Sequence, residues 1–505
     1  YALSELRNSQ SAAAGAAPAV INNFGTVDVN GRITNSGIIH NFGDFRLNAA
    51  ILSFHGGVFN NGAGGVLTIG DALYTLNLGS AAAGTINLLP GSRLLVSGGL
   101  SIAPGYKQIN EGEISVGAAG QLSVFGELQF GNGNLNGSMA SSGELTTHGI
   151  SGGVVSFLRS DDTSFSNLIS GSGGVVKRGV NTLTFTGDQT YTGLTSVESG
   201  RLTLAGQTRS GHIRIAASAH LELQTPTDRD NTADTRFTGQ GTLVKTGGGT
   251  MLWGASRAVF ALDAGARIDV LGGMFVAGSN ANDDWSENRA GLFVAGGATF
   301  WGAENNVRLD ALSGSGRIHS GFNGAGYEAL RFGMAGGSGS FSGVLADTDA
   351  ANRHVGSFIK EGAGTQVLTG DNTFTGDLGI LAGQVQIGDG GTSGSLAARS
   401  IVNQAELSFS RSDDSRFDGT IVGSGNLTKL GAGQLTLTQS RATLSPGYSG
   451  LTSVRGGTLV LTHINNSRGH DISPGAVLEL QVASGSRNGA VATQFTGQGT
   501  LRKSG

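Results

Sequence analysis

The sequence predicts an all-β protein whose short strands stack into a parallel β-solenoid. Three observations predict this fold. A block of about ninety residues occurs twice, a shorter period of 19 to 24 residues runs inside that block, and 88 of the 505 residues are glycine without the Gly-X-Y period of collagen. Repeats of this length bury their apolar faces only by stacking on their neighbours, which is the principle of a solenoid.

The long duplication defines two repeat blocks, residues 159–247 and 411–505. Phe237–Leu243 returns unchanged as Phe495–Leu501, at an offset of 258. Other matching stretches have offsets of 252 and 257, so a few residues are added in the second block. Two copies with unequal offsets indicate one architecture that tolerates insertions.

The short period places apolar side chains two residues apart, as on one face of a strand. Leu183 and Phe185 are followed 19 residues later by Leu202 and Leu204. The corresponding pairs of the second block are 24 residues apart, and the five extra residues fall in the polar stretch 439–447. A coil of nearly constant circumference with insertions at polar corners is what a solenoid of β-strands requires.

The composition limits the possible functions. The net charge is -4 for 51.0 kDa, and no cluster of Lys and Arg is present, which disfavours nucleic-acid binding. The absence of Cys excludes disulfides, thiolate zinc sites and cysteine nucleophiles. No run of 18 apolar residues occurs, so we expect no membrane-spanning helix.

Along the chain, residues 1–20 are expected to form a leader or cap, and residues 21–505 a single β-helix. Near its start, four asparagines spaced 18, 19 and 17 residues apart each precede a glycine by two positions: Asn23, Asn41, Asn60 and Asn77. Asn and Gly accept the left-handed backbone angles of tight corners. Their even spacing predicts a ladder of stacked side-chain amides.

Further turns are expected from residue 85 onward, whereas the segment 253–340 is less regular and contains all three tryptophans. At about 20 to 25 residues per turn and a strand spacing of about 4.8 Å, the chain should form roughly 20 to 25 turns over about 100 Å. Leu, Val, Ile and Phe are expected to stack in the interior.

Two stretches with this pattern resemble the autotransporter-associated β-strand repeat of Gram-negative bacteria: Gly179–Val197 and Lys360–Gly376. The resemblance covers residues 159–505. It implies a pertactin-like, right-handed parallel β-helix that is the passenger domain of a type V secreted protein. Such a passenger crosses the periplasm and the outer membrane and is displayed at the bacterial cell surface or secreted, which fits a Cys-free chain. The alternating strands of a C-terminal translocator barrel are not recognised in this sequence, so we interpret it as the passenger without its translocator.

Sequence patterns of hydrolases are weak. Gly149–Gly153 and Gly391–Ser395 have the composition of serine-nucleophile motifs, but such matches are expected by chance in a glycine-rich chain, and the partner motifs are missing. Some parallel β-helices cleave polysaccharides, for which paired carboxylates are needed. The candidate groups are three Asp pairs and two Gly-His dipeptides that resemble parts of polygalacturonases: Asp161-Asp162, Asp283-Asp284, Asp413-Asp414, Gly211-His212 and Gly469-His470. Two Asp pairs are copies of each other many turns apart, which favours solvated turns, so we predict no catalytic residues.

The nine histidines lack zinc-ligand spacing, and no calcium-binding glycine repeat occurs, so we predict no metal and no cofactor. Recognition is the remaining class of function, and polar insertions between turns are the expected binding sites. The candidates are one loop with a tryptophan and two further insertions: Asp283, Asp284, Trp285, Glu287 and Arg289, with Arg229 and Tyr448. Trp and Arg are frequent interface anchors.

We therefore predict a passenger that binds host proteins, either as an adhesin for a host cell surface or by capturing a soluble defence factor such as a complement regulator or a protease inhibitor. Self-association of the passenger in bacterial aggregation is the alternative, and a polysaccharide-cleaving enzyme is the third hypothesis.

Overall fold

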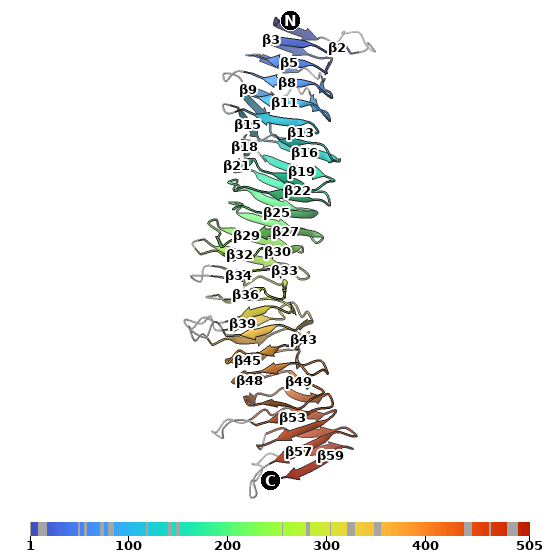
Figure 1. Cartoon of the computed structure of the whole chain (residues 1–505), viewed down its shortest axis with the longest axis vertical. Coiled ribbons are helices and arrows are strands. Elements are labelled where there is room, and N and C mark those ends of the chain that lie inside the picture. Colours follow the sequence, from blue (N-terminus) through green and yellow to red (C-terminus); the bar gives the residue numbers. More distant parts are fainter. Residues whose placement is uncertain are drawn as a thin grey trace. The chain divides into compact units, whose positions relative to one another are not determined.

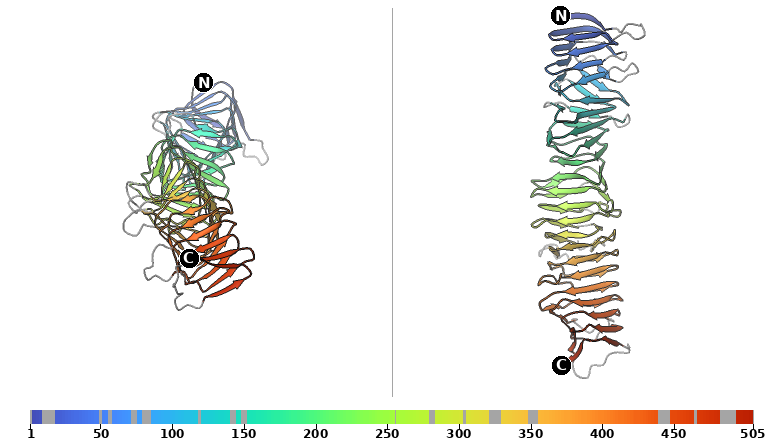
Figure 2. Two further views of the ribbon diagram at one scale, coloured as in Figure 1. Left: turned by 60° about the horizontal axis from the view of Figure 1, so that its bottom comes forward. Right: turned by 90° about the vertical axis from the view of Figure 1, so that its right-hand side faces the viewer.

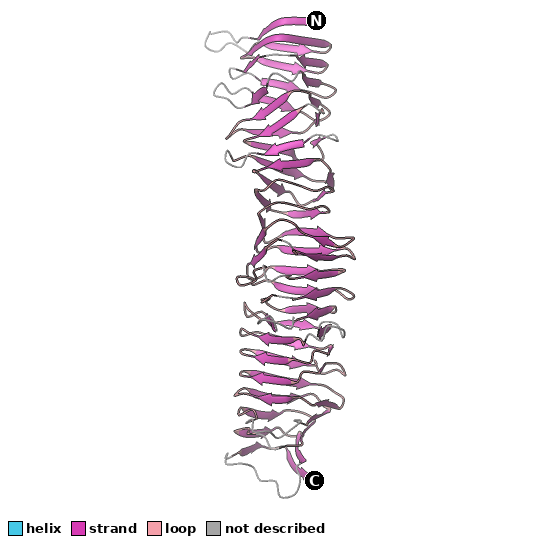
Figure 3. Ribbon diagram, turned by 90° about the vertical axis from the view of Figure 1, so that its left-hand side faces the viewer, coloured by secondary structure: helices cyan, strands magenta, loops and turns pink. Residues whose placement is uncertain are grey.

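The computed structural model of the chain consists of short strands joined by tight turns (Figure 1). It describes residues 2–8, 18–48, 51–54, 58–70, 75–78, 85–117, 120–139, 144–147, 152–254, 256–278, 283–302, 305–320, 329–347, 355–438, 447–463, 466–481 and 493–504. In these residues every regular element is a β-strand, as Figure 3 shows in magenta. No helix in them is long and apolar enough to cross a membrane.

The chain forms two compact units. The first unit comprises Tyr1–Gln224 and Thr232–Gly241, and the second comprises Thr225–Asn231 and Thr242–Gly505. Each unit is a parallel β-solenoid, in which a strand pairs with the strand one turn away rather than with its neighbour in sequence (Figures 1 and 2). The described residues form about 19 turns, slightly fewer than the 20 to 25 expected.

In the first unit, one long parallel sheet joins β2 (Val20–Asn23), β4 (Ile38–Asn41), β7 (Val58–Asn61), β10 (Thr85–Leu88), β13 (Lys107–Asn110), β16 (Glu127–Asn134), β19 (Val154–Arg159), β22 (Gly174–Arg178), β24 (Leu194–Val197), β26 (His212–Ile215) and β29 (Thr235–Gly239). A second face contains β20 (Thr163–Phe165), β23 (Thr182–Phe185), β25 (Gly200–Leu204) and β27 (Ala219–Gln224). Part of the expected leader, β1 (Ala2–Asn8), is itself a strand of this solenoid and pairs with β3 (Thr26–Asn35).

In the second unit, the principal sheet joins β30 (Thr242–Thr246), β33 (Arg267–Val270), β35 (Gly291–Val294), β37 (Leu312–Gly314), β40 (Gly339–Phe341), β43 (Thr365–Leu368), β46 (Gln384–Ile387), β49 (Glu406–Ser410), β52 (Asn426–Leu430), β54 (Leu451–Val454), β56 (Gly469–Ile472) and β58 (Gln494–Gly497). Two further faces contain β28 (Arg229–Asp230), β31 (Thr250–Leu252), β34 (Met274–Val276), β36 (Thr299–Trp301), β38 (Arg317–His319) and β41 (Val344–Ala346), and β39 (Ala329–Phe332), β42 (Ser357–Lys360), β45 (Asp377–Ile380), β48 (Ser400–Asn403) and β51 (Thr420–Val422). The segment 253–340, which was expected to be less regular, therefore continues the strands of the solenoid.

The register confirms the period found in the sequence. Leu183 aligns with Leu202, and Phe185 aligns with Leu204, in the parallel pair of β23 and β25. All four side chains are buried. Like side chains thus stack turn on turn, and each turn gains an apolar core only through its neighbours.

The predicted asparagine ladder exists, but Asn61 takes the place of Asn60 in it. Asn23 Nδ2 donates to Asn41 Oδ1 at 2.7 Å, and Asn41 Nδ2 donates to Asn61 Oδ1 at 2.8 Å. The expected member Asn60 lies one position away, where it pairs with Asn87 on the other face at 2.6 Å. Because a shift of one residue reverses the side of a strand, the prediction of Asn60 was wrong. The side chain of Asn77 lies outside the described residues.

Candidate functional site: a polar pocket among repeated structural motifs

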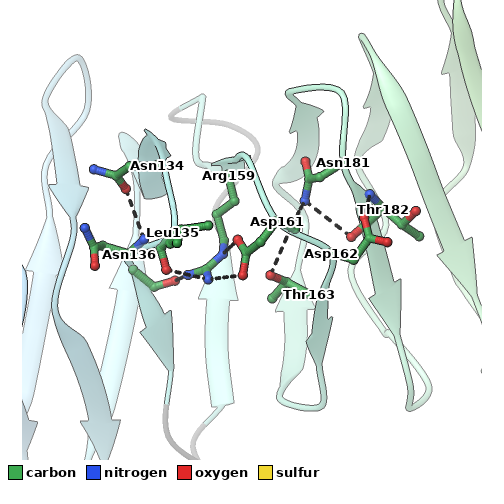
Figure 4. A network of polar contacts seen from close by, with 10 residues as sticks. Asn134, Leu135, Asn136, Arg159, Asp161, Asp162, Thr163, Asn181 and Thr182 are labelled. Carbon is green, nitrogen blue, oxygen red and sulfur yellow. Dashed lines mark hydrogen bonds and ion pairs between the residues drawn. The ribbon is translucent and has the colours of Figure 1, made fainter.

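The duplicated Arg-Ser-Asp-Asp motif ties turns together (Figure 4). Arg159 at the end of β19 donates to both carboxylate oxygens of Asp161, at 2.9 and 2.8 Å, and to the carbonyl oxygen of Gly137 at 2.5 Å. Hydrogen bonding from Arg159 lowers the pKa of Asp161. Asp162 accepts the backbone N–H of Thr182 at 2.7 Å. Asp161 therefore holds the Arg159 side chain that reaches the preceding turn, and Asp162 bonds to the following turn.

The second copy repeats this arrangement. Arg411 holds Asp413 through two hydrogen bonds of 2.9 and 2.7 Å and donates to the carbonyl oxygen of Gly394 at 2.8 Å. Asp414 accepts a backbone N–H from the next turn at 3.1 Å. The stretch 391–395, which has the composition of a nucleophile motif, belongs to the glycine-rich turn that Arg411 fastens. The other such stretch, 149–153, lies mostly outside the described residues.

The two histidines considered for polysaccharide cleavage differ in their burial and their contacts. His212 is half-buried, and its Nε2 lies 2.7 Å from the hydroxyl of Thr238. His470 is buried and stacks on Phe495 with ring centroids 5.0 Å apart. Burial lowers the pKa of His470 to about 4. In the strand registers His212 aligns with Leu194, whereas Gly469, not His470, aligns with Leu451, so the two histidines face opposite sides.

Four buried lysines form a motif that sequence reasoning missed: Lys177, Lys245, Lys360 and Lys429. Each amine donates to backbone carbonyls at a glycine corner, and Lys245 Nζ reaches Gly247, Gly249 and Gly272 at 2.7, 2.6 and 2.7 Å. Burial lowers the pKa of Lys245 to about 8. The signal in the sequence was a glycine two positions after each lysine.

Tyr448 belongs to an internal hydrogen-bond chain. It is fully buried, and its hydroxyl lies 2.6 Å from that of Thr452, which donates to Ser467 Oγ at 3.0 Å. Burial raises the pKa of Tyr448. Tyr191 forms the same chain in the first block, with its hydroxyl 2.7 Å from that of Thr195. The two tyrosines are separated by the same offset as other duplicated residues, which was the signal in the sequence. The Tyr448 side chain is not presented at the surface.

Trp285 likewise lies in the core. It is 1% exposed, stacks on Phe260 with ring centroids 3.9 Å apart, and meets Phe300 edge to face. Its indole Nε1 donates to the carbonyl oxygen of Ala277 at 2.8 Å, which satisfies the buried polar atom. The ring supports the loop from beneath.

Asp283 is buried beside this aromatic cluster. Its side chain is 5% exposed, and Oδ1 accepts the backbone N–H of Ala258 at 2.6 Å. Oδ2 is buried without a hydrogen-bond partner. Burial raises the pKa of Asp283 to about 7, against the opposing effects of the Ala258 N–H and of Arg257. This carboxyl therefore holds its proton over a range in which an exposed aspartate is ionised.

An open pocket of about 500 Å³, here named the Asp283 pocket, lies above these residues. Its walls come from the loop before β35, the loop before β37, and β39: Asp283, Asp284, Trp285, Ser286, Asn305, Asn306, Arg308 and Arg331. Asn305 Nδ2 donates to the carbonyl oxygen of Asp283 at 2.7 Å and links the two loops. The structure thus brings together three of the residues predicted for binding.

The other residues predicted for binding do not line the Asp283 pocket. Glu287 and Arg289 are exposed on the same loop, and Arg229 is half-exposed on β28. The non-adjacent residues Asn306, Arg308 and Arg331 were missed, because only the stacking of turns brings them beside Asp283. Among the described residues no group of three or more His, Cys, Asp or Glu side chains is arranged to hold a metal ion.

The fold and its repeated corner motifs define a β-solenoid of the kind used by exported passenger domains. The passenger-associated-transport-repeat family matches residues 175–204, 358–387 and 427–461. These segments contain three of the four buried lysines, Lys177, Lys360 and Lys429. The matched repeats therefore coincide with turns that share one corner structure.

A stretch of 89 residues is 39% identical to the adhesin BmaC autotransporter of Brucella suis biovar 1 (strain 1330). The alignment covers 18% of this chain and 2% of the length of that relative. The repeats, this similarity and the β-solenoid together fit a pertactin-like autotransporter passenger. The matched repeats and this similarity support export, with display at the cell surface or secretion.

Proposed function

We propose that this passenger works by binding, as an adhesin for host cells or as a receptor for a soluble host protein. The observation that carries the proposal is the similarity of an 89-residue stretch of the chain to an autotransporter adhesin. The duplicated Asp pairs support it, because Asp161 and Asp413 are engaged by arginines and their neighbours Asp162 and Asp414 hold backbone N–H groups. These two of the three Asp pairs first considered for catalysis thus have structural partners.

The place of binding that we propose is the Asp283 pocket with the exposed side chains of the same loop, Glu287 and Arg289. A rigid solenoid holds such a loop in a fixed position, since the core below it is tightly packed. Trp285 and its aromatic neighbours provide this packing. The partner that we propose is a host protein or a host cell surface.

The test uses the whole chain, immobilised and incubated with human serum, and in parallel fluorescently labelled chain added to cultured epithelial cells. Mass spectrometry of the bound fraction should identify the same serum protein in repeated captures, or saturable cell binding should be seen. Beads coupled to albumin, and labelled albumin, serve as controls. If neither serum proteins nor cells are bound above these controls, the proposal is refuted.

Self-association is a second candidate, favoured by an exposed aromatic stack in the first unit. Phe24 and Phe42 are 75% and 41% exposed, and their rings stack with centroids 5.2 Å apart. Exposed apolar side chains in contact with each other are typical of association surfaces. Light scattering across concentration should show dimers that Phe24→Ser together with Phe42→Ser abolishes, and a wild-type monomer at high concentration would exclude this function.

A further inference from the structure

The Asp283 pocket has an uneven balance of charge. Asp284 pairs with Arg257 at 3.2 Å, and Arg331 pairs with Glu361. Arg308 also lines the pocket, and its guanidinium has no carboxylate partner among the described residues. One guanidinium is therefore left to attract an anion.

A buried hydrogen-bonding atom belongs to the same pocket. Asp283 lines it, and Oδ2 of this side chain has no partner among the described residues although the side chain is only 5% exposed. Buried polar atoms are nearly always hydrogen-bonded in folded proteins, so this oxygen has room for a partner such as a water molecule or a ligand hydroxyl.

We propose that the Asp283 pocket binds an acidic saccharide, whose carboxylate pairs with Arg308 and whose neighbouring hydroxyl bonds to Asp283 Oδ2. A guanidinium presents a planar fork that matches the two oxygens of a carboxylate. A hydroxyl both donates and accepts, so it can pair with Asp283 whether or not that carboxyl holds its proton. An ammonium group is disfavoured, because the guanidinium groups of Arg308 and Arg331 line the site.

The volume and the polar lining of the pocket support a sugar rather than an apolar peptide side chain. A volume of about 500 Å³ lies within the range of small-ligand sites and accommodates a sugar unit with its substituents. The apolar rings that could anchor a peptide are buried beneath the pocket, with Trp285 only 1% exposed. What the walls present instead are amide, carboxyl and guanidinium groups, including the exposed Asn306.

This inference rests on the proposed binding function and assigns a class of ligand to it. Its test is titration of the whole chain with N-acetylneuraminic acid and with glucuronic acid, followed by saturation-transfer NMR, with galactose and acetate as comparison probes. We expect both acids to bind, galactose and acetate to bind much more weakly, and Arg308→Gln to raise the Kd of the acids by about tenfold or more. Arg308→Lys should recover only part of the affinity, because it keeps the charge and loses the fork.

The matched control is Arg468→Gln, an exposed arginine outside the pocket, which should leave the Kd unchanged. Tryptophan fluorescence during urea unfolding verifies that each variant is folded. Equal binding of galactose, equal binding of acetate, absence of binding by the acids, or an unchanged Kd in Arg308→Gln would each overturn the assignment.

Failure of this inference can be told apart from failure of the proposed function. If Arg308→Gln binds serum proteins and cells as the wild type does, the saccharide site is not what carries binding, while the passenger remains a binding protein. If the wild type binds acidic saccharides but neither serum proteins nor cells, the pocket stands and the host-binding function fails.

Discussion

The buried carboxyl of Asp283 should make the stability of the second unit depend on pH. Burial raises its pKa to about 7 in the folded protein, whereas the ordinary value is 3.8. The folded state therefore retains a proton that the unfolded state has released. Between about pH 4 and pH 7 the free energy of unfolding should fall as the pH rises, and it should become level above about pH 7.

The size of this effect follows from the two pKa values. A folded pKa of about 7 against 3.8 corresponds to about 4 kcal/mol at most, lost between acid and neutral pH. Asp283→Asn removes the titration, and its side-chain oxygen can still accept the N–H of Ala258. We expect this variant to resemble the wild type near pH 4 and to be more stable than the wild type at pH 8, by up to that amount.

Urea unfolding monitored by tryptophan fluorescence is the suitable assay. All three tryptophans, Trp253, Trp285 and Trp301, lie in the second unit, so the signal reports on the structure around Asp283. The measurement compares wild type and Asp283→Asn from pH 4 to pH 8. If the two proteins lose stability in parallel over this range, the reasoning about the buried carboxyl is refuted.

Asp284→Asn is the matched control. Asp284 Oδ1 accepts the N–H of Ser286 at 2.9 Å, and hydrogen bonding from the Ser286 side chain and from this N–H lowers the pKa of Asp284. A lowered folded pKa contributes stability at neutral pH that is lost as the pH falls through that value. Its replacement by Asn should therefore destabilise the protein at pH 7 and have little effect in acid, which is the opposite pattern to Asp283→Asn.

Three further predictions concern the repeated corner motifs, each measured as the free energy of urea unfolding. Lys245→Met should lower the free energy of unfolding by about 2 kcal/mol, because three carbonyl oxygens lose their donor. Replacing the exposed Lys503 by Met should change it by less than about 0.5 kcal/mol. Equal effects of the two substitutions would contradict the structural role of Lys245. Tyr448→Phe should cost about 1 kcal/mol for one lost buried hydrogen bond, and an unchanged stability would argue against the internal chain. Arg411→Lys should cost about 1 kcal/mol, because an ammonium group cannot hold Asp413 through two parallel bonds, and a neutral result would show that the fork is dispensable.

The stacking of turns was predictable because it depends on local patterns. Alternation at Leu183 and Phe185 specifies which side of a strand is buried, and the constant spacing to Leu202 and Leu204 specifies which residues lie above one another. The ladder showed the limit of this reasoning. Spacing alone did not distinguish Asn60 from Asn61, since the two differ by one position and point to opposite faces.

The site was predictable only in part. The polar loop was recognised from its composition, and Asp283 and Asp284 do line a pocket. Trp285 and Tyr448 were candidates for binding a partner, and both fill the core of their own turns. An aromatic residue in a polar stretch carries no sign of which way its ring turns, because that depends on residues of the neighbouring turns.

By itself the sequence determined a repeating parallel β-solenoid, a chain without disulfides and a resemblance to exported passengers, since periodicity, composition and repeat motifs are local properties. Only the tertiary structure decided that the lysines before glycine corners are buried, that the paired aspartates hold turns together, and that Arg308 and Arg331 stand beside Asp283. The physical reason is that residues of different turns meet through stacking, and their side chains acquire partners, burial and altered pKa values only there.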